Sequence, residues 1–246
     1  MKLIRADWQA PAHIHALTTT RLDGVSETPF DGLNLGDHVG DAAAAVAENR
    51  KVLLNALGLV QPPQWLSQVH GVRVVEAIAD SQVREADGCW TGTPGLACVV
   101  MTADCLPVLI TDRQGKRVAA AHAGWRGLAS GVLEATLAHF PDPEDLLVWL
   151  GPAIGPLAFE VGDEVREQFV RALPDCEAAF QTSPTDPSKW LADIYQLARL
   201  RLNAAGVSEV SGGDYCTFTE SDYFYSYRRD GQTGRMASLI WIDANP

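Results

Sequence analysis

Positive charge is scarce in this sequence of 246 residues. It carries 19 lysine and arginine residues against 31 aspartate and glutamate residues, which gives a net charge of −12. Proteins bind nucleic acids and anionic membranes mainly through cationic side chains that displace counterions. The charge balance therefore predicts that neither nucleic acid nor a membrane is the main partner.

Long hydrophobic segments are also missing. The longest apolar stretches, such as LACVVMTA and LLVWL, are much shorter than the roughly 20 residues that span a bilayer. Arg5, Asp7 and Gln9 interrupt the apolar residues near the start, so this segment does not resemble a secretory signal. We expect a cytoplasmic protein.

Cysteine is rare, and the five cysteines are an odd number. In a long chain without a visible export signal, this usage is typical of reduced thiols rather than a disulfide framework. A cysteine with a special role is therefore predicted to be a metal ligand or a nucleophile.

The rest of the composition is that of a globular protein. Hydrophobic residues make up 47% and charged residues 20% of the chain, which argues against disorder, collagen and coiled coil. A chain of this length can bury a full core. Because the sequence shows no internal repeat, flexible linker or low-complexity tract, we predict one domain over residues 1–246.

Strand and helix patterns alternate irregularly along the chain. Asp41 is predicted to cap a helix that ends at Gly58, and a second amphipathic helix is predicted to end at Gly206. The middle of the chain contains several short strand patterns, and residues 113–116 are typical of a hairpin turn between two of them. This mixture predicts an α+β fold with mixed β-sheets flanked by helices.

Three of the expected strands end near a residue that can bind a borderline metal, namely His70, Cys105 and His122. If these strand ends converge, two imidazoles and one thiolate form a set suited to zinc, with the fourth tetrahedral position left for water or substrate. Their separations of 35 and 17 residues match no short zinc motif. Simple packing of Cys105 in the core is therefore the alternative interpretation.

Two segments are candidates for binding an anion. Arg228, Arg229 and Arg235 lie among tyrosines in an otherwise acidic chain, and guanidinium groups bind phosphate with two hydrogen bonds. A solvated hairpin is the alternative for this segment. The Gly-Trp-Arg-Gly turn that contains Arg126 precedes a predicted helix, whose first N–H groups attract negative charge.

Several unusual strings occur together in this chain and closely resemble the YfiH-like family, whose members are described as laccase-domain polyphenol oxidases and as purine nucleoside phosphorylases. The similarity extends from NLGDHVGD at 34–41 to the last predicted strand. The strings are SQVHG at 67–71, ADG at 86–88, TADCLPVLITD at 102–112, AHAGWRG at 121–127, GPAIG at 151–155, FEVG at 159–162 and YSYRRDGQTGRMAS at 225–238.

The resemblance implies an α+β fold with sheets packed between helical layers. It implies a catalytic zinc site on His70, Cys105 and His122, phosphorolysis of adenosine, inosine and methylthioadenosine, and deamination of adenosine. By their positions in the family's motifs, four residues are predicted to contact substrate or phosphate: Asn34, Arg50, Arg126 and Arg229. The expected partners are a nucleoside and phosphate, and a homodimer is left open.

Other activities are open at this point. The six histidines, with one HxH pair, are too few for a multicopper laccase, although Cu²⁺ could occupy the three proposed zinc ligands and make the chain a copper-dependent polyphenol oxidase. A cysteine or metal-dependent hydrolase that edits peptidoglycan precursors is another candidate, with Cys105 as nucleophile and His70 or His122 as base. A binding module with a structural metal is disfavoured because a fourth protein ligand is missing.

Overall fold

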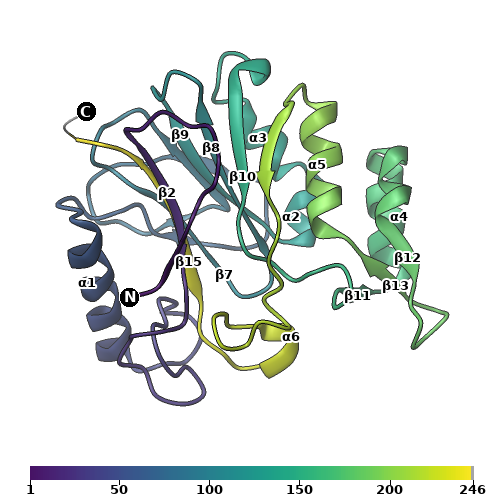
Figure 1. Ribbon diagram of the computed structural model, residues 1–246, viewed down its shortest axis with the longest axis horizontal. Helices are drawn as coiled ribbons and strands as arrows, with labels where there is room; N and C mark the ends of the chain where they lie inside the picture. Colours follow the sequence, from purple (N-terminus) through teal and green to yellow (C-terminus); the bar gives the residue numbers. More distant parts are fainter. Residues whose placement is uncertain (245–246) are drawn as a thin grey trace.

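Two β-sheets face each other in the centre of the molecule, and helices cover both outer faces (Figure 1). The computed structural model describes residues 1–244. None of the helices in this part of the chain has the length and apolar surface needed to cross a bilayer. The helices are α1 (Ala43–Leu57), α2 (Trp125–Ser130), α3 (Val132–Leu137), α4 (Asp163–Ala172), α5 (Ile194–Ala204) and α6 (Tyr227–Asp230), with 3-10 turns η1 (Pro143–Asp145) and η2 (Pro174–Ala179).

The strands fall into four sheets. The six-stranded sheet has the order β14-β10-β8-β9-β6-β4, the four-stranded sheet β1-β2-β15-β7, the three-stranded sheet β11-β13-β12, and β3 pairs with β5. The strands are β1 (Leu3–Arg5), β2 (Ile14–Thr19), β3 (Leu66–Ser67), β4 (Val74–Glu76), β5 (Arg84–Glu85), β6 (Gly88–Thr91), β7 (Cys98–Thr102), β8 (Leu106–Asp112), β9 (Val118–Ala123), β10 (Leu146–Leu150), β11 (Glu160–Val161), β12 (Phe180–Thr182), β13 (Trp190–Ala192), β14 (Glu209–Gly212) and β15 (Met236–Ile242).

The layered arrangement follows from the apolar faces of the two large sheets. Val100 and Ile240 of the four-stranded sheet pack against Leu109 and Val118 of the six-stranded sheet. On the opposite face of the four-stranded sheet lies α1, which contributes Leu53 to a separate apolar cluster. Helices α2, α3 and α5 cover the other face of the six-stranded sheet (Figure 1). The expectation of mixed sheets packed between helical layers is confirmed.

The six-stranded sheet is mixed in direction. β8 pairs antiparallel with both β9 and β10, whereas β14 and β4 join the two edges in parallel. The predicted hairpin between β8 and β9 is present, and the carboxylate of Asp112 accepts hydrogen bonds from the N–H groups of Gln114, Lys116 and Arg117. These bonds close the turn and fix the pairing of the two strands.

The predicted end of α1 is confirmed, whereas the predicted residue at its start is not. Gly58 ends the helix in the left-handed conformation, with φ of 65°, as expected. Asp41 does not cap its start, and that prediction was wrong. The residue at the N-cap is Ala42, while the Asp41 carboxylate accepts hydrogen bonds from Ser26 and Asn34 instead.

The helix expected after the Gly-Trp-Arg-Gly turn is broken into two. Gly131, with φ of 103°, ends α2 and starts α3, and such a φ is readily adopted only by glycine. Leu128 and Val132 are both buried against the sheet. The break changes the direction of the chain without exposing the apolar residues.

Candidate metal centre

The three residues selected as metal ligands lie together. One ligand atom from each of His70, Cys105 and His122 lies within 4.8 Å of the others. Cys105 Sγ is 3.7 Å from His70 Nε2, and the centroids of the two imidazole rings are 4.7 Å apart. The trio lines a cavity of about 490 Å³. The convergence expected from the sequence is therefore present.

The β8–β9 hairpin brings two of these residues side by side. In its register, Pro107 lies opposite His122 and Leu106 lies opposite Ala123. Cys105 immediately precedes β8, so its thiol reaches the end of β9 where His122 is placed. His122 is 3% exposed, and Cys105 is only partly buried. Strand pairing thus fixes the separation of the thiol and the buried imidazole.

His70 reaches the site from a tight turn rather than from a strand end. The predicted strand through this region is shorter than expected, because β3 stops at Ser67. The turn wraps around one carboxylate: the N–H groups of Val69, His70 and Gly71 all donate to Asp87, over 2.7–3.2 Å. His70 has a φ of 61° in this turn. The carboxylate therefore determines where His70 points.

Asp87 also orients the second imidazole. Its Oδ1 lies 2.8 Å from Nδ1 of His122, and its side chain is fully buried. A carboxylate on one ring nitrogen fixes the tautomer of a metal-binding histidine and leaves the other nitrogen free to coordinate. Sequence reasoning missed Asp87 as a functional residue. The available signal was an acidic residue directly before the buried strand β6, inside the string ADG.

The electrostatics of the trio favour an ionised thiol. Burial opposes ionisation of Cys105, but the imidazoles of His122 and His70 outweigh it and lower the pKa of the thiol to about 6. Burial likewise opposes charge on His122, yet Cys105 and Asp87 raise the pKa of His122 to about 9. These shifts favour a thiolate beside an imidazolium in the metal-free site, and metal binding would displace the imidazolium proton.

Gly124 leaves the space that the ligands need. A Cβ atom at this position would lie 2.7 Å from Cδ2 of His70 and 3.0 Å from Sγ of Cys105. Neither neighbour can retreat without leaving the cluster. The glycine that starts the Gly-Trp-Arg-Gly turn is thus required for the close approach of α2 to the ligand trio.

The walls of the cavity combine aromatic and cationic side chains. The aromatic residues are Trp125, Phe159 and Tyr227, and the arginines are Arg126, Arg228 and Arg235. The arginines lie close to ring faces: Arg126 is 4.4 Å above Trp125, and Arg228 is 5.6 Å above Phe159. The cavity can therefore receive a molecule that has both a flat apolar part and an anionic part.

Of the four residues predicted to contact substrate or phosphate, Arg126 lines this cavity, whereas Asn34, Arg50 and Arg229 do not. Asn34 is fully buried, and its amide nitrogen donates to Gly36 O and to Asp41. These bonds shape the loop before α1. The side chain of Asn34 therefore stabilises this loop and does not line the cavity.

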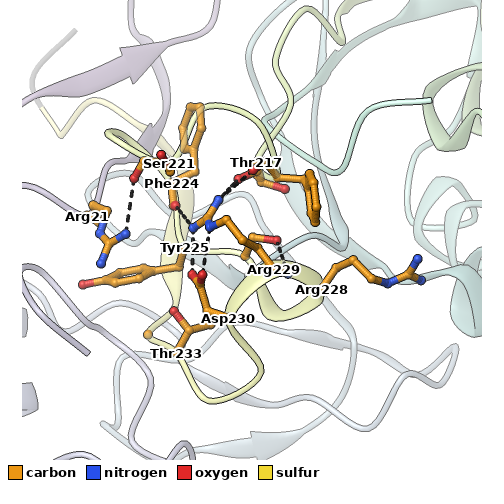
Figure 2. A network of polar contacts seen from close by, with 12 residues as sticks. Arg21, Thr217, Ser221, Phe224, Tyr225, Arg228, Arg229, Asp230 and Thr233 are labelled. Atoms are coloured by element: carbon orange, nitrogen blue, oxygen red, sulfur yellow. Dashed lines mark hydrogen bonds and ion pairs between the residues drawn. The ribbon is translucent and has the colours of Figure 1, made fainter. Parts of the chain in front are cut away.

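Arg50 and Arg229 also bind groups of the chain itself. The Arg50 guanidinium donates twice to Leu35 O and lies 4.1 Å above the Trp65 ring. Arg229 donates to the carbonyls of Thr217, Phe218 and Phe224 and pairs with Asp230 (Figure 2). The arginines of this segment that reach the cavity are Arg228 and Arg235.

The donor set fits a borderline divalent metal. Two imidazole nitrogens and one thiolate are the ligand types of catalytic zinc sites with three protein ligands, and Cu²⁺ binds the same types. The carboxylate behind His122 completes the usual second layer of such a site. The cavity borders the trio on the side where a fourth ligand or a substrate would enter.

Comparison with known proteins agrees with the YfiH-like resemblance. The chain is 59% identical to a purine nucleoside phosphorylase of Pseudomonas aeruginosa over 96% of both chains, and 54% identical to the purine nucleoside phosphorylase YfiH of Escherichia coli over 98% of this chain and 99% of that one. A crystal structure from Neisseria meningitidis superposes with a TM-score of 0.95 at 49% identity, covering 99% of this chain and 100% of the other. Residues 15–243 match the family described as multi-copper polyphenol oxidoreductase laccase, and the chain belongs to this family of YfiH-like proteins.

Proposed function

We propose that the protein is a zinc-dependent purine nucleoside phosphorylase that acts on adenosine, inosine and methylthioadenosine and also deaminates adenosine. The relatives named purine nucleoside phosphorylase support the reaction class. The observation that carries the proposal is a single cavity that combines a His-Cys-His trio with aromatic rings and three arginines.

The cavity suits the two parts of a nucleoside substrate. Trp125, Phe159 and Tyr227 offer ring faces for a purine, and Met101 and Ile154 add apolar surface. The ribose C1′ must lie near an anion for phosphorolysis, and the arginines supply the positive charge that holds inorganic phosphate there. The nucleoside and the phosphate can therefore be bound side by side.

His70, Cys105 and His122 are the residues that would hold the metal. When bound, Zn²⁺ supplies a Lewis acid that activates water or polarises a substrate oxygen. Asp87 holds His122 with its second nitrogen directed to the site and, through the turn at residues 69–71, also positions His70. The chain thereby delivers two aligned imidazoles before any metal or substrate binds.

The proposal is tested with purified protein loaded with zinc. Incubation with adenosine and phosphate should release adenine and ribose 1-phosphate, and incubation without phosphate should give inosine. Products are separated by liquid chromatography, and inosine and methylthioadenosine are assayed in the same way. If zinc-loaded protein forms none of these products, the proposed function is rejected.

A cysteine hydrolase is the second candidate, because the geometry also matches a nucleophile beside a base. Cys105 Sγ lies 3.7 Å from His70 Nε2, and the pKa of the thiol is lowered to about 6 by the two imidazoles against the opposing effect of burial. Such an enzyme would be active without metal and inactivated by iodoacetamide. A zinc phosphorylase would instead lose activity to a chelator and recover it with zinc.

Copper oxidation is the least supported activity. Among residues 1–244, the His-Cys-His trio is the single group with metal-binding geometry. A multicopper laccase needs a histidine-rich cluster in addition to its first copper site. Oxidation of a phenol by copper-loaded protein at a rate far above that of free Cu²⁺ would support this activity.

A further inference from the structure

Three arginines converge on the cavity without carboxylate partners. Within residues 1–244, Arg126, Arg228 and Arg235 form no ion pair, although the chain as a whole has a net charge of −12. Some other arginines pair, as Arg201 does with Glu134 and Arg229 with Asp230, and what distinguishes the unpaired Arg126, Arg228 and Arg235 is that they share one cavity. Unpaired cations gathered in a cleft of an acidic protein attract an anionic ligand.

Asp104 is the one acidic residue within positions 1–244 that lines the cavity, and both of its oxygens accept hydrogen bonds from the chain. Oδ1 accepts a hydrogen bond from Thr217 Oγ1 and Oδ2 accepts one from the N–H of Arg228, each at 2.7 Å. The carboxylate therefore connects the turn before Cys105 to Thr217 and to α6. It forms no ion pair with an arginine side chain of the described residues. Three guanidinium groups against one carboxylate leave the cavity positively charged.

Arg235 lines the cavity together with the metal trio. Burial lowers its pKa, and the negative groups of Cys105 and Asp104 oppose that shift, so its guanidinium lies within electrostatic reach of the thiol. One terminal nitrogen, Nη1, donates to the carbonyls of Thr233 and Gly234. Among the described residues, no partner is found for Nε or Nη2, and those two donors can bind an oxyanion with two hydrogen bonds.

Arg228 is held over the cavity in the same way. Its backbone is anchored to Asp104, and its Nη1 donates to the carbonyl of Glu160 on β11 at 2.8 Å. Figure 2 shows that the side chains of Arg228 and Arg229 leave α6 in different directions, with Arg229 turned into the loop that it holds. Arg229 thus braces the segment, while Nε and Nη2 of Arg228 have no partner among the described residues and can bind an anion.

We propose that Arg228 and Arg235, together with Arg126, form an oxyanion subsite beside the metal trio that binds inorganic phosphate, and that Arg229 is a positioning residue for this subsite. The identity of the anion rests on the proposed phosphorylase function. The subsite itself rests on the unpaired guanidinium groups and on the brace formed by Arg229.

The test compares zinc-loaded Arg235→Gln and Arg228→Gln with the original protein and with Arg171→Gln. Arg171 is an exposed arginine of α4 that does not line the cavity, so its variant controls for the loss of one positive charge. Inosine phosphorolysis is measured as hypoxanthine release, first varying phosphate and then varying inosine. Binding of inorganic phosphate is measured separately by ³¹P nuclear magnetic resonance.

We expect each cavity variant to raise the KM for phosphate about tenfold or more, the effect of losing a charge-assisted hydrogen bond, and to change the KM for inosine less than about twofold. Zinc content should stay at the level of the original protein in every variant that folds. Arg228 is exposed, so its variant keeps the test valid if Arg235→Gln fails to fold. An unchanged KM for phosphate in the folded variants overturns the subsite.

The two proposals fail in distinguishable ways. If the original protein binds phosphate through these arginines but forms no ribose 1-phosphate, the phosphorylase function is wrong and the subsite stands. If it forms ribose 1-phosphate and the variants bind phosphate normally, the subsite is wrong and the function stands. Absence of both binding and product overturns both.

Discussion

The floor and the wall of the cavity are held in place by different means. The floor, which contains Cys105 and His122, is fixed by the pairing of β8 with β9 and by a buried carboxylate behind it. The wall that contains Tyr227, Arg228 and Arg235 belongs to residues 217–235, a segment of loops around α6 that is held by hydrogen bonds from arginine side chains to carbonyl groups. Substitutions in the floor should therefore change the affinity for metal, and substitutions in the wall should change the binding of inorganic phosphate.

Loss of a metal ligand should have the largest effect. Cys105→Ala removes the thiolate, and we expect loss of both bound zinc and phosphorolysis, exceeding the 10- to 100-fold loss of metal affinity that outer residues typically cause. Metal content by mass spectrometry and product formation measure the outcome. Full zinc occupancy in this variant would contradict the assignment of Cys105 as a ligand.

Changing the carboxylate behind the ligands should have the next largest effect. In the original protein the Asp87 carboxylate accepts hydrogen bonds from three backbone N–H groups and binds Nδ1 of His122. Asp87→Asn replaces this carboxylate by a neutral amide, and we expect metal affinity to fall by about 10- to 100-fold. Competition with a chromophoric chelator measures the affinity.

Asp112→Asn is the matched control for Asp87→Asn. Asp112 is also buried and also accepts three backbone hydrogen bonds, but it closes the far end of the β8–β9 hairpin and touches no ligand. Both variants should lower the melting temperature, whereas only Asp87→Asn should weaken zinc binding. Equal loss of zinc in the two variants would show that Asp87 acts through stability alone.

Crowding the floor should have a moderate effect. Gly124→Ala adds a methyl group 2.7 Å from His70 and 3.0 Å from Cys105, and overpacking of this kind costs about 1–3 kcal/mol. Because the crowded atoms belong to the ligands, we expect zinc affinity to fall. Thermal unfolding with and without zinc measures this: the stabilisation by zinc should shrink, and an unchanged zinc-dependent shift would refute the steric role of Gly124.

Removing the brace of the wall should have the smallest effect on catalysis. Arg229→Ala leaves the carbonyls of Thr217, Phe218 and Phe224 without their donor, which should lower the free energy of unfolding by about 1–3 kcal/mol. The KM for phosphate should rise less than in Arg235→Gln, and Arg229→Lys should recover part of the stability. A large rise in this KM at unchanged stability would mean that Arg229 contacts phosphate directly.

The sequence predicted the floor better than the wall. Residue type and the position at expected strand ends made His70, Cys105 and His122 candidates, and the resemblance to the YfiH-like family implied the same three ligands. Asp87 was missed because its hydrogen bonds run to a turn distant in the sequence, and no local pattern reveals such a contact. Arg229 was predicted from its position in the family's motif, and in the structure its side chain binds carbonyl groups of the loop while Arg228 lines the cavity. Sequence alone does not fix the directions in which adjacent side chains leave a short helical turn.

The place of β15 in the four-stranded sheet has a consequence for biosynthesis. β15 lies between β2 and β7, so strands from the first and the middle parts of the chain are joined through residues 236–242. Long-range pairings of this kind form late and slowly. We therefore expect the sheet that contains β7, and with it the position of the Cys105 thiol that follows β7, to be completed only after residues 236–242 have been synthesised.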